Sequence, residues 1–119
     1  MRESAIRDEL ARLTLELCSI PSETGNEKEI ADWIEERCLE AVGRQGTIRI
    51  GNSVVCVPPA VDPSLPTVAL VGHTDTVKCA TEQPLEIRES RVYGCGASDM
   101  KAGVATMLAL LARRDELVA

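Results

Sequence analysis

The sequence contains no phenylalanine, and Trp33 and Tyr93 are its only aromatic residues. Any hydrophobic core must therefore be built from leucine, isoleucine, valine and alanine. Long apolar runs are also missing, because none approaches the roughly 18 residues that a membrane-spanning helix needs. The charged N-terminus lacks the apolar segment of a secretory signal peptide. We therefore expect no membrane partner.

Positive charge is scarce as well. The 13 basic residues are outnumbered by 19 acidic ones, which gives a formal net charge of -6. Nucleic acids and anionic membranes attract basic surfaces, so this balance disfavours both as main partners. The acidic residues are spread along the chain and form no tail. With 119 residues, the chain has room for one modest domain with a small core.

Cysteine pairs with metal-ligand spacing are absent. The cysteines are odd in number, widely spaced and never part of a Cys-x-x-Cys pair, which argues against a disulfide framework and a thiolate zinc site. Several fall on apolar faces, where cysteine acts as a small hydrophobic residue. This usage is typical of a reducing, cytoplasmic location. The residues concerned are Cys18, Cys38, Cys56, Cys79 and Cys95.

Three stretches carry apolar residues at helical spacing with charges between them. They predict helices at residues 4–18, from about 26 to 43, and roughly at 100–114. Asn26 and Glu29 form a capping-box-like pair at the start of the second helix. Ser98 or Asp99 is expected to cap the third helix by accepting hydrogen bonds from its first N–H groups.

The remaining apolar stretches are shorter and predict strands. One hairpin is expected at residues 47–57 around the turn Gly51-Asn52, and a second around Glu89-Ser90. Residues 67–72 are apolar at nearly every position, which is typical of a strand buried on both faces. Strands and helices mixed around such a central strand predict the α/β class.

Polar residues follow directly after this central strand. His73, the only histidine, and Asp75 are two positions apart, so in an extended segment both face the same side. Ligands of open α/β sheets bind beyond the carboxyl ends of such strands. The alternative is structural: a single histidine at a strand end is often only hydrogen-bonded locally, and an aspartate there often belongs to a turn.

A glycine-rich turn, residues 94–99, precedes the third helix. Its Gly-x-Gly pattern resembles a dinucleotide fingerprint, but Asp99 replaces the last glycine and would repel a pyrophosphate. Asp99 could also serve as a helix cap alone. In the third interpretation this carboxylate bridges two metal ions, since each of its oxygens can hold one cation. Imidazole and carboxylate ligands together suit zinc or a similar divalent metal.

Two separated motifs carry a family resemblance. GHTDTV at 72–77, followed by YGCGASDMKAG at 93–103, resembles the metallohydrolases that include succinyl-diaminopimelate desuccinylase, acetylornithine deacetylase, aminoacylase and carboxypeptidase G. IPS at 20–22 and GNSV at 51–54 also fit the family. The resemblance covers nearly all of the chain and is strongest to the desuccinylases. It implies a zinc-aminopeptidase-like catalytic domain, with a mixed sheet flanked by helices.

The resemblance implies a role for each matching residue. His73 would bind one metal ion, and Asp99 would bridge two zinc ions, with cobalt or manganese as possible replacements. Asp75 is the catalytic candidate, because it would hydrogen-bond the histidine instead of the metal and so fix its tautomer. The implied reaction is hydrolysis of the amide bond of an N-acyl amino acid, in which a glutamate acts as general base. The substrate implied first is N-succinyl-diaminopimelate, an intermediate of lysine biosynthesis. Acetylornithine deacetylase, aminoacylase and carboxypeptidase activities are the alternatives.

The sequence departs from the family pattern at several points. Cys95 stands where arginine is common, and Lys78 stands where many members have proline. The family's paired glutamates are missing, since Glu35-Glu36 lies on the second helix and precedes His73. The resemblance therefore implies that residues 1–119 are the N-terminal portion of the catalytic domain, without the dimerisation domain of a homodimeric full-length enzyme. The isolated chain is then expected to be inactive, and a truncated product with at most weak metal binding is the alternative.

Overall fold

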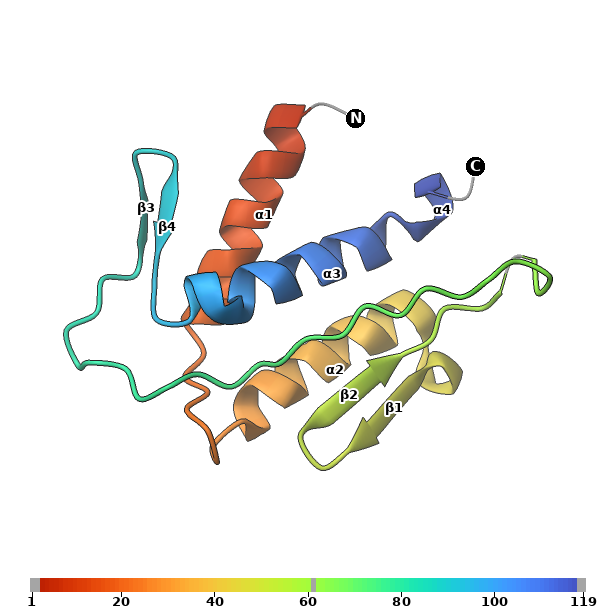
Figure 1. Cartoon of the computed structure of the whole chain (residues 1–119), viewed down its shortest axis with the longest axis horizontal. Helices are drawn as coiled ribbons and strands as arrows, with labels where there is room; N and C mark the ends of the chain where they lie inside the picture. Colours follow the sequence, from red (N-terminus) through yellow and green to blue (C-terminus); the bar gives the residue numbers. More distant parts are fainter. Residues whose placement is uncertain (1–2, 61, 118–119) are drawn as a thin grey trace.

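The computed structural model describes residues 3–60 and 62–117, and helices dominate it (Figure 1). The helices are α1 (Glu3–Cys18), α2 (Lys28–Val42), α3 (Ala102–Ala112) and the single turn α4 (Arg114–Leu117). The three helices expected from apolar periodicity are therefore confirmed. Gly43 follows α2 with a positive φ of 74°, and its N–H donates to the Leu39 carbonyl, as expected for a glycine that ends a helix.

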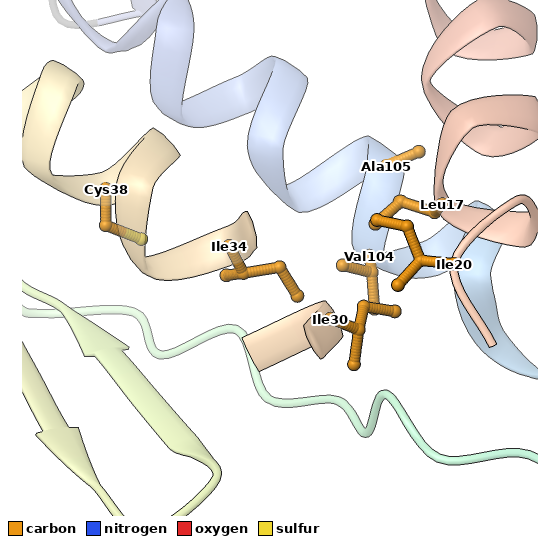
Figure 2. Close-up of a cluster of buried hydrophobic side chains, with 7 residues drawn as sticks. All are labelled: Leu17, Ile20, Ile30, Ile34, Cys38, Val104 and Ala105. Atoms are coloured by element: carbon orange, nitrogen blue, oxygen red, sulfur yellow. The ribbon is translucent and has the colours of Figure 1, made fainter. Parts of the chain in front are cut away.

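The hydrophobic core lies where α1, α2 and α3 meet (Figure 2). It is entirely aliphatic apart from one cysteine, as the shortage of aromatic residues requires. Leu17 and Ile30 are fully buried, and each contributes about 1.5–3 kcal/mol through removal of its side chain from water. The cluster consists of Leu17, Ile20, Ile30, Ile34, Cys38, Val104 and Ala105.

Within the described residues, four strands form two separate antiparallel hairpins. They are β1 (Thr47–Ile50), β2 (Ser53–Cys56), β3 (Glu86–Arg88) and β4 (Arg91–Tyr93). Ile50 pairs with Ser53, so Gly51-Asn52 forms the two-residue turn expected from the sequence. Both predicted hairpins and the α/β class are confirmed, although the strands are arranged as two hairpins and not as one mixed sheet. The short helix η1 (Arg44–Gly46) connects α2 to β1, and the β1–β2 hairpin lies against α2 (Figure 1).

The buried strand expected at 67–72 is not formed. This segment is extended but has no strand partner within the described part of the chain (Figure 1). Val68 and Val71 are 81% and 86% exposed. Its sequence has the apolar pattern of a buried strand, but a strand also needs a neighbour to share its backbone hydrogen bonds and to cover its faces.

The side-chain caps expected for the second and third helices are not formed either. Glu27 and Lys101 occupy the N-cap positions of α2 and α3, and neither makes a side-chain capping bond. Before α3, the one-turn segment η2 (Ala97–Lys101) contains extended backbone at Asp99, with φ of -135° and ψ of 93°. Met100 is also non-helical, so Asp99 lies outside α3, and its carboxylate contacts Nε2 of His73.

A disulfide joins Cys79 to Cys95, which corrects the expectation drawn from cysteine spacing. The β3–β4 hairpin folds the chain back on itself, so these two residues lie 5.9 Å apart between Cα atoms despite a sequence separation of 16. Disulfides persist mainly in oxidising compartments, so cysteine usage no longer supports a cytoplasmic location, which stays a prediction. Within residues 3–60 and 62–117, every helix is too short or too polar to cross a membrane.

Candidate metal centre

The two motifs of the sequence meet at one pocket. It has a volume of about 360 Å³ and lies between the segment that follows residues 67–72 and the glycine-rich turn. Its lining is Thr24, His73, Asp75, Thr76, Val77, Gly94, Gly96, Ala97, Ser98 and Asp99. The three candidate site residues, His73, Asp75 and Asp99, are therefore all on its wall. His73 and Asp75 still face each other, although the expected strand is not formed.

His73 contacts both aspartates through different ring nitrogens. Its Nε2 lies 3.0 Å from Oδ1 of Asp99. Its Nδ1 lies 3.2 Å from Oδ1 of Asp75 and 3.2 Å from the Asp75 backbone oxygen. Acceptors face both ring nitrogens, so the metal-free site favours a proton on each of them. When Nε2 binds a metal ion and gives up its proton, the two acceptors at Nδ1 keep the remaining proton there.

The charges of these residues influence one another. Hydrogen bonding from the Thr24 hydroxyl, then from the residue's own backbone, and then the proximity of His73 hold the pKa of Asp75 below its usual value. Partial desolvation by itself lowers the pKa of His73, but the Asp75 carbonyl and the carboxylates of Asp99 and Asp75 outweigh it. The pKa of His73 is therefore raised above its usual value. The site favours a positive charge between its two carboxylates.

Gly96 allows the glycine-rich turn to approach His73 and Asp75 closely. Its φ of +83° lies in the left-handed region that favours glycine. A Cβ atom at this position would lie 2.4 Å from Cγ2 of Thr76, so a larger residue would push the two segments apart. The turn then continues through the Asp99-Met100 peptide bond, which is cis. Asp99 presents its carboxylate to the pocket from this turn.

The donor pair fits a divalent metal ion. Two ligands that share one tetrahedral zinc ion lie roughly 3.4 Å apart, because each is about 2.0–2.2 Å from the ion. The 3.0 Å between Nε2 of His73 and Oδ1 of Asp99 is close to that spacing. Among the residues that the structure describes, no group of three potential ligands is gathered at one place. The pair therefore fits the ion as part of a ligand set, short of the usual four ligands.

Glu35 lies outside this site, as the sequence indicated. Its carboxylate pairs with Arg49 of β1 at 3.1 Å, so it supports the packing of the hairpin against α2. Sequence reasoning missed three residues that contact the site segments. The sequence motifs assign no role at the site to Thr24, Ser22 or Lys101. Their roles depend on contacts between distant parts of the chain, and no local pattern indicated them.

Comparison with known proteins supports the family resemblance. Residues 69–118 match the peptidase family M20/M25/M40. Succinyl-diaminopimelate desuccinylase of Corynebacterium glutamicum is 40% identical over 111 residues, covering 88% of this chain and 29% of the relative. A putative succinyl-diaminopimelate desuccinylase of Mycobacterium tuberculosis is 37% identical over 111 residues, covering 93% and 31%. Cysteinylglycine-S-conjugate dipeptidase of Corynebacterium striatum is 32% identical over 97 residues, covering 72% and 21%.

The chain thus spans about 30% of the length of the two desuccinylases that it matches. No solved structure matches it. The matched region contains His73, Asp75 and Asp99, and the similarity to the desuccinylases extends over most of the chain. On these grounds, the chain belongs to the peptidase family M20/M25/M40.

Proposed function

We propose that this chain supplies part of the metal centre of an amidohydrolase. The observation that carries the proposal is the 3.0 Å approach of His73 Nε2 to Asp99 Oδ1, with Asp75 on the opposite side of the imidazole ring. His73 and Asp99 would be metal ligands, and zinc is the ion that the imidazole and carboxylate donors suit best. Asp99 has a second oxygen and an exposed side chain, so its carboxylate could bridge two ions.

The chain's own residues prepare the site before any metal arrives. Asp75 accepts a hydrogen bond from Nδ1–H of His73 and so directs the Nε2 lone pair into the pocket. Thr24 donates to the other oxygen of Asp75 at 2.7 Å. A bound zinc ion would supply Lewis acidity to the scissile carbonyl and to a water molecule. We propose that residues 1–119 are the N-terminal portion of the catalytic domain. The general base and the remaining ligands would come from residues beyond this portion.

The proposed substrate is an N-acyl amino acid, first of all N-succinyl-diaminopimelate. The support is the similarity to one succinyl-diaminopimelate desuccinylase and to a putative one. Such a reaction would release succinate in lysine biosynthesis. Similarity to a dipeptidase shows that related chains act on other amides, so deacylases and carboxypeptidases of the family are the alternative. We further propose that the full-length protein is a cytoplasmic homodimer that binds a small-molecule substrate and neither nucleic acid nor membrane.

One observation favours a second candidate function. The described residues supply only the pair His73 and Asp99, with no third potential ligand beside them. The isolated 119 residues would then bind metal at most weakly and would not turn over substrate. In that case the chain would be a non-catalytic fragment with a partial metal site.

The experiment compares metal uptake with hydrolysis. Zinc binding to this chain is measured by equilibrium dialysis for the wild type, His73→Ala and Asp99→Asn, with Asp62→Asn on an exposed loop as control. We expect both site variants to lose binding and the control to retain it. Zinc binding unchanged in both site variants would contradict the metal site.

Hydrolysis is assayed with the polypeptide made from the complete reading frame that contains this chain. N-succinyl-diaminopimelate, N-acetylornithine and a dipeptide serve as substrates. We expect turnover of the succinyl substrate, lost in Asp99→Asn and retained in Asp62→Asn. Absence of turnover on all three substrates would overturn the proposed reaction, and preference for another substrate would select one of the alternatives.

A further inference from the structure

The loop between α1 and α2 contacts both segments that carry the proposed ligands. We propose that residues 20–24, named here the strap, are a positioning element that sets the geometry of His73, Asp75 and Asp99. The inference rests on the proposed function, because it concerns the same pair of ligands. Figure 1 shows the strap as the orange connection at the foot of α1.

The strap holds the backbone on both sides of Asp75. Ser22 is 1% exposed, and its hydroxyl donates to the Thr74 carbonyl at 2.6 Å. The N–H of Thr76 donates to the Ser22 carbonyl at 2.9 Å, and the N–H of Thr24 donates to the Thr76 carbonyl at 3.0 Å. Glu23 and Thr76 form an isolated parallel bridge. Asp75 therefore sits between two residues whose backbone atoms are bonded to the strap.

The strap also orients the Asp75 side chain. The Thr24 hydroxyl donates to Oδ2 of Asp75 at 2.7 Å, while Oδ1 of the same carboxylate faces Nδ1 of His73. A carboxylate free to rotate could present either oxygen to His73, or neither. Because Thr24 occupies one oxygen, the other is held toward the imidazole ring. Thr24 thus acts on the proposed ligand through Asp75.

Lys101 ties the other ligand segment to the same strap. It is 2% exposed, and its Nζ donates to the Ile20 carbonyl at 2.8 Å. Burying an ammonium group is costly unless it is hydrogen-bonded, and packing alone would be served better by an apolar side chain. Lys101 is two residues after Asp99, so this bond fixes the end of the turn that presents the Asp99 carboxylate. The strap therefore positions both proposed ligands, His73 through Asp75 and Asp99 through Lys101.

The first test uses the single histidine as a reporter. Because the chain has one histidine, its ¹⁵N imidazole signals are unambiguous. We compare the wild type with Thr24→Val, which keeps the shape of threonine and loses the hydroxyl, and with Thr24→Ser, which restores a hydroxyl. Thr106→Val is the matched control, since the exposed Thr106 hydroxyl bonds only within α3. The spectra are recorded where the ring is neutral. We expect Thr24→Ser and Thr106→Val to show the wild-type tautomer distribution, and the Nε2–H form to gain population in Thr24→Val.

The second test measures cobalt affinity from the visible absorbance of bound Co²⁺. Loss of a group that orients a ligand typically costs about 10–100-fold in metal affinity. We expect a loss at the lower end of that range in Thr24→Val and in Lys101→Met. Lys101→Met should leave the His73 tautomer unchanged, because Lys101 acts on the Asp99 side. Lys28→Met, which removes an exposed amine from α2, should bind as the wild type does. Circular dichroism checks that each variant is folded. If Lys101→Met is not, Ser22→Ala tests the strap through its bond to the Thr74 carbonyl, with the same expected loss of affinity.

The outcomes separate the strap from the proposed function. A wild-type His73 spectrum in folded Thr24→Val would overturn the strap, and so would a Thr24→Ser variant that fails to restore the wild-type tautomer. Failure of the wild-type chain to take up cobalt would instead count against the proposed metal centre. The His73 spectra would still decide whether the strap orients the ring.

Discussion

Nε2 of His73 lies 3.0 Å from Oδ1 of Asp99, although 26 positions separate these residues in the sequence. Two features bring them together. Gly96 permits close approach of the glycine-rich turn to Thr76, and the disulfide between Cys79 and Cys95 links the two segments beside the pocket. The pair is thus a product of tertiary structure, although each residue belongs to a motif that the sequence alone reveals.

The pKa of His73 should be measurably raised in the metal-free chain. Replacing Asp75 by asparagine removes a carboxylate beside Nδ1 and should lower that pKa, whereas Asp62→Asn in a distant loop should not. The measurement is the ¹H NMR titration of the His73 ring. An unchanged titration curve in Asp75→Asn would show that this carboxylate does not act on the ring.

The direction in which stability changes with pH follows from the raised pKa of His73. Because the folded-state pKa of His73 is raised, its contribution to stability is complete below the unfolded value, about 6.5. It is lost as the pH rises through the folded pKa. Metal binding requires the neutral ring, so zinc affinity should increase over the same rise in pH. Urea unfolding and zinc titrations at several pH values test both slopes. His73→Ala should remove this contribution to the pH dependence of unfolding and should lose zinc binding.

Removing the disulfide should destabilise the chain. A cross-link that closes a loop of about 15 residues contributes about 3 kcal/mol by restricting the unfolded state, and Cys79 and Cys95 are separated by 16 positions. The double variant Cys79→Ser, Cys95→Ser should therefore have its unfolding midpoint at a lower urea concentration than the wild type. Dithiothreitol should lower the midpoint of the wild type but leave that of the double variant unchanged. Equal midpoints for the oxidised wild type and the double variant would contradict the prediction.

Gly96→Ala should destabilise the chain more than Gly51→Ala does. Both glycines have a positive φ, but only Gly96 has an atom close to the new methyl group. At Gly96 the new methyl group meets Thr76 in addition to the positive φ, whereas at Gly51 a Cβ has nothing within 4 Å. We expect about 1–2 kcal/mol for Gly51→Ala from the left-handed conformation alone, and a larger loss for Gly96→Ala. Gly96→Ala should also weaken zinc binding, because it separates Asp99 from His73. Urea unfolding and equilibrium dialysis test the two effects, and equal stability losses would argue against the close approach.

The exposed apolar segment at 67–72 should promote self-association. Val68 and Val71 are mostly exposed, and the extended backbone has no strand partner in the described residues, which is the form of edge that pairs with other chains. Val71→Lys should reduce association measured by sedimentation velocity at increasing concentration. Thr67→Lys adds the same charge without removing an apolar side chain and should have a smaller effect. A wild type that stays monomeric at all concentrations would contradict this prediction.

Local sequence determined most of the secondary structure. The helices followed from apolar residues at helical spacing, because one face of each helix must be buried wherever the helix packs. The β1–β2 hairpin followed from Gly51-Asn52, because a two-residue turn needs a residue that accepts positive φ. The motifs around His73 and Asp99 also indicated the family, since the residue types and their order carry that information without any geometry.

Tertiary structure alone decided the rest. Residues 67–72 have the composition of a buried strand, yet burial and strand pairing depend on neighbours that a sequence pattern does not place. The disulfide required that Cys79 and Cys95 meet, which the β3–β4 hairpin brings about. Thr24 and Lys101 reach their partners across 51 and 81 positions of the chain. Such contacts depend on how the helices pack, so the sequence motifs could indicate the candidate ligands but not the residues that we propose hold them in place.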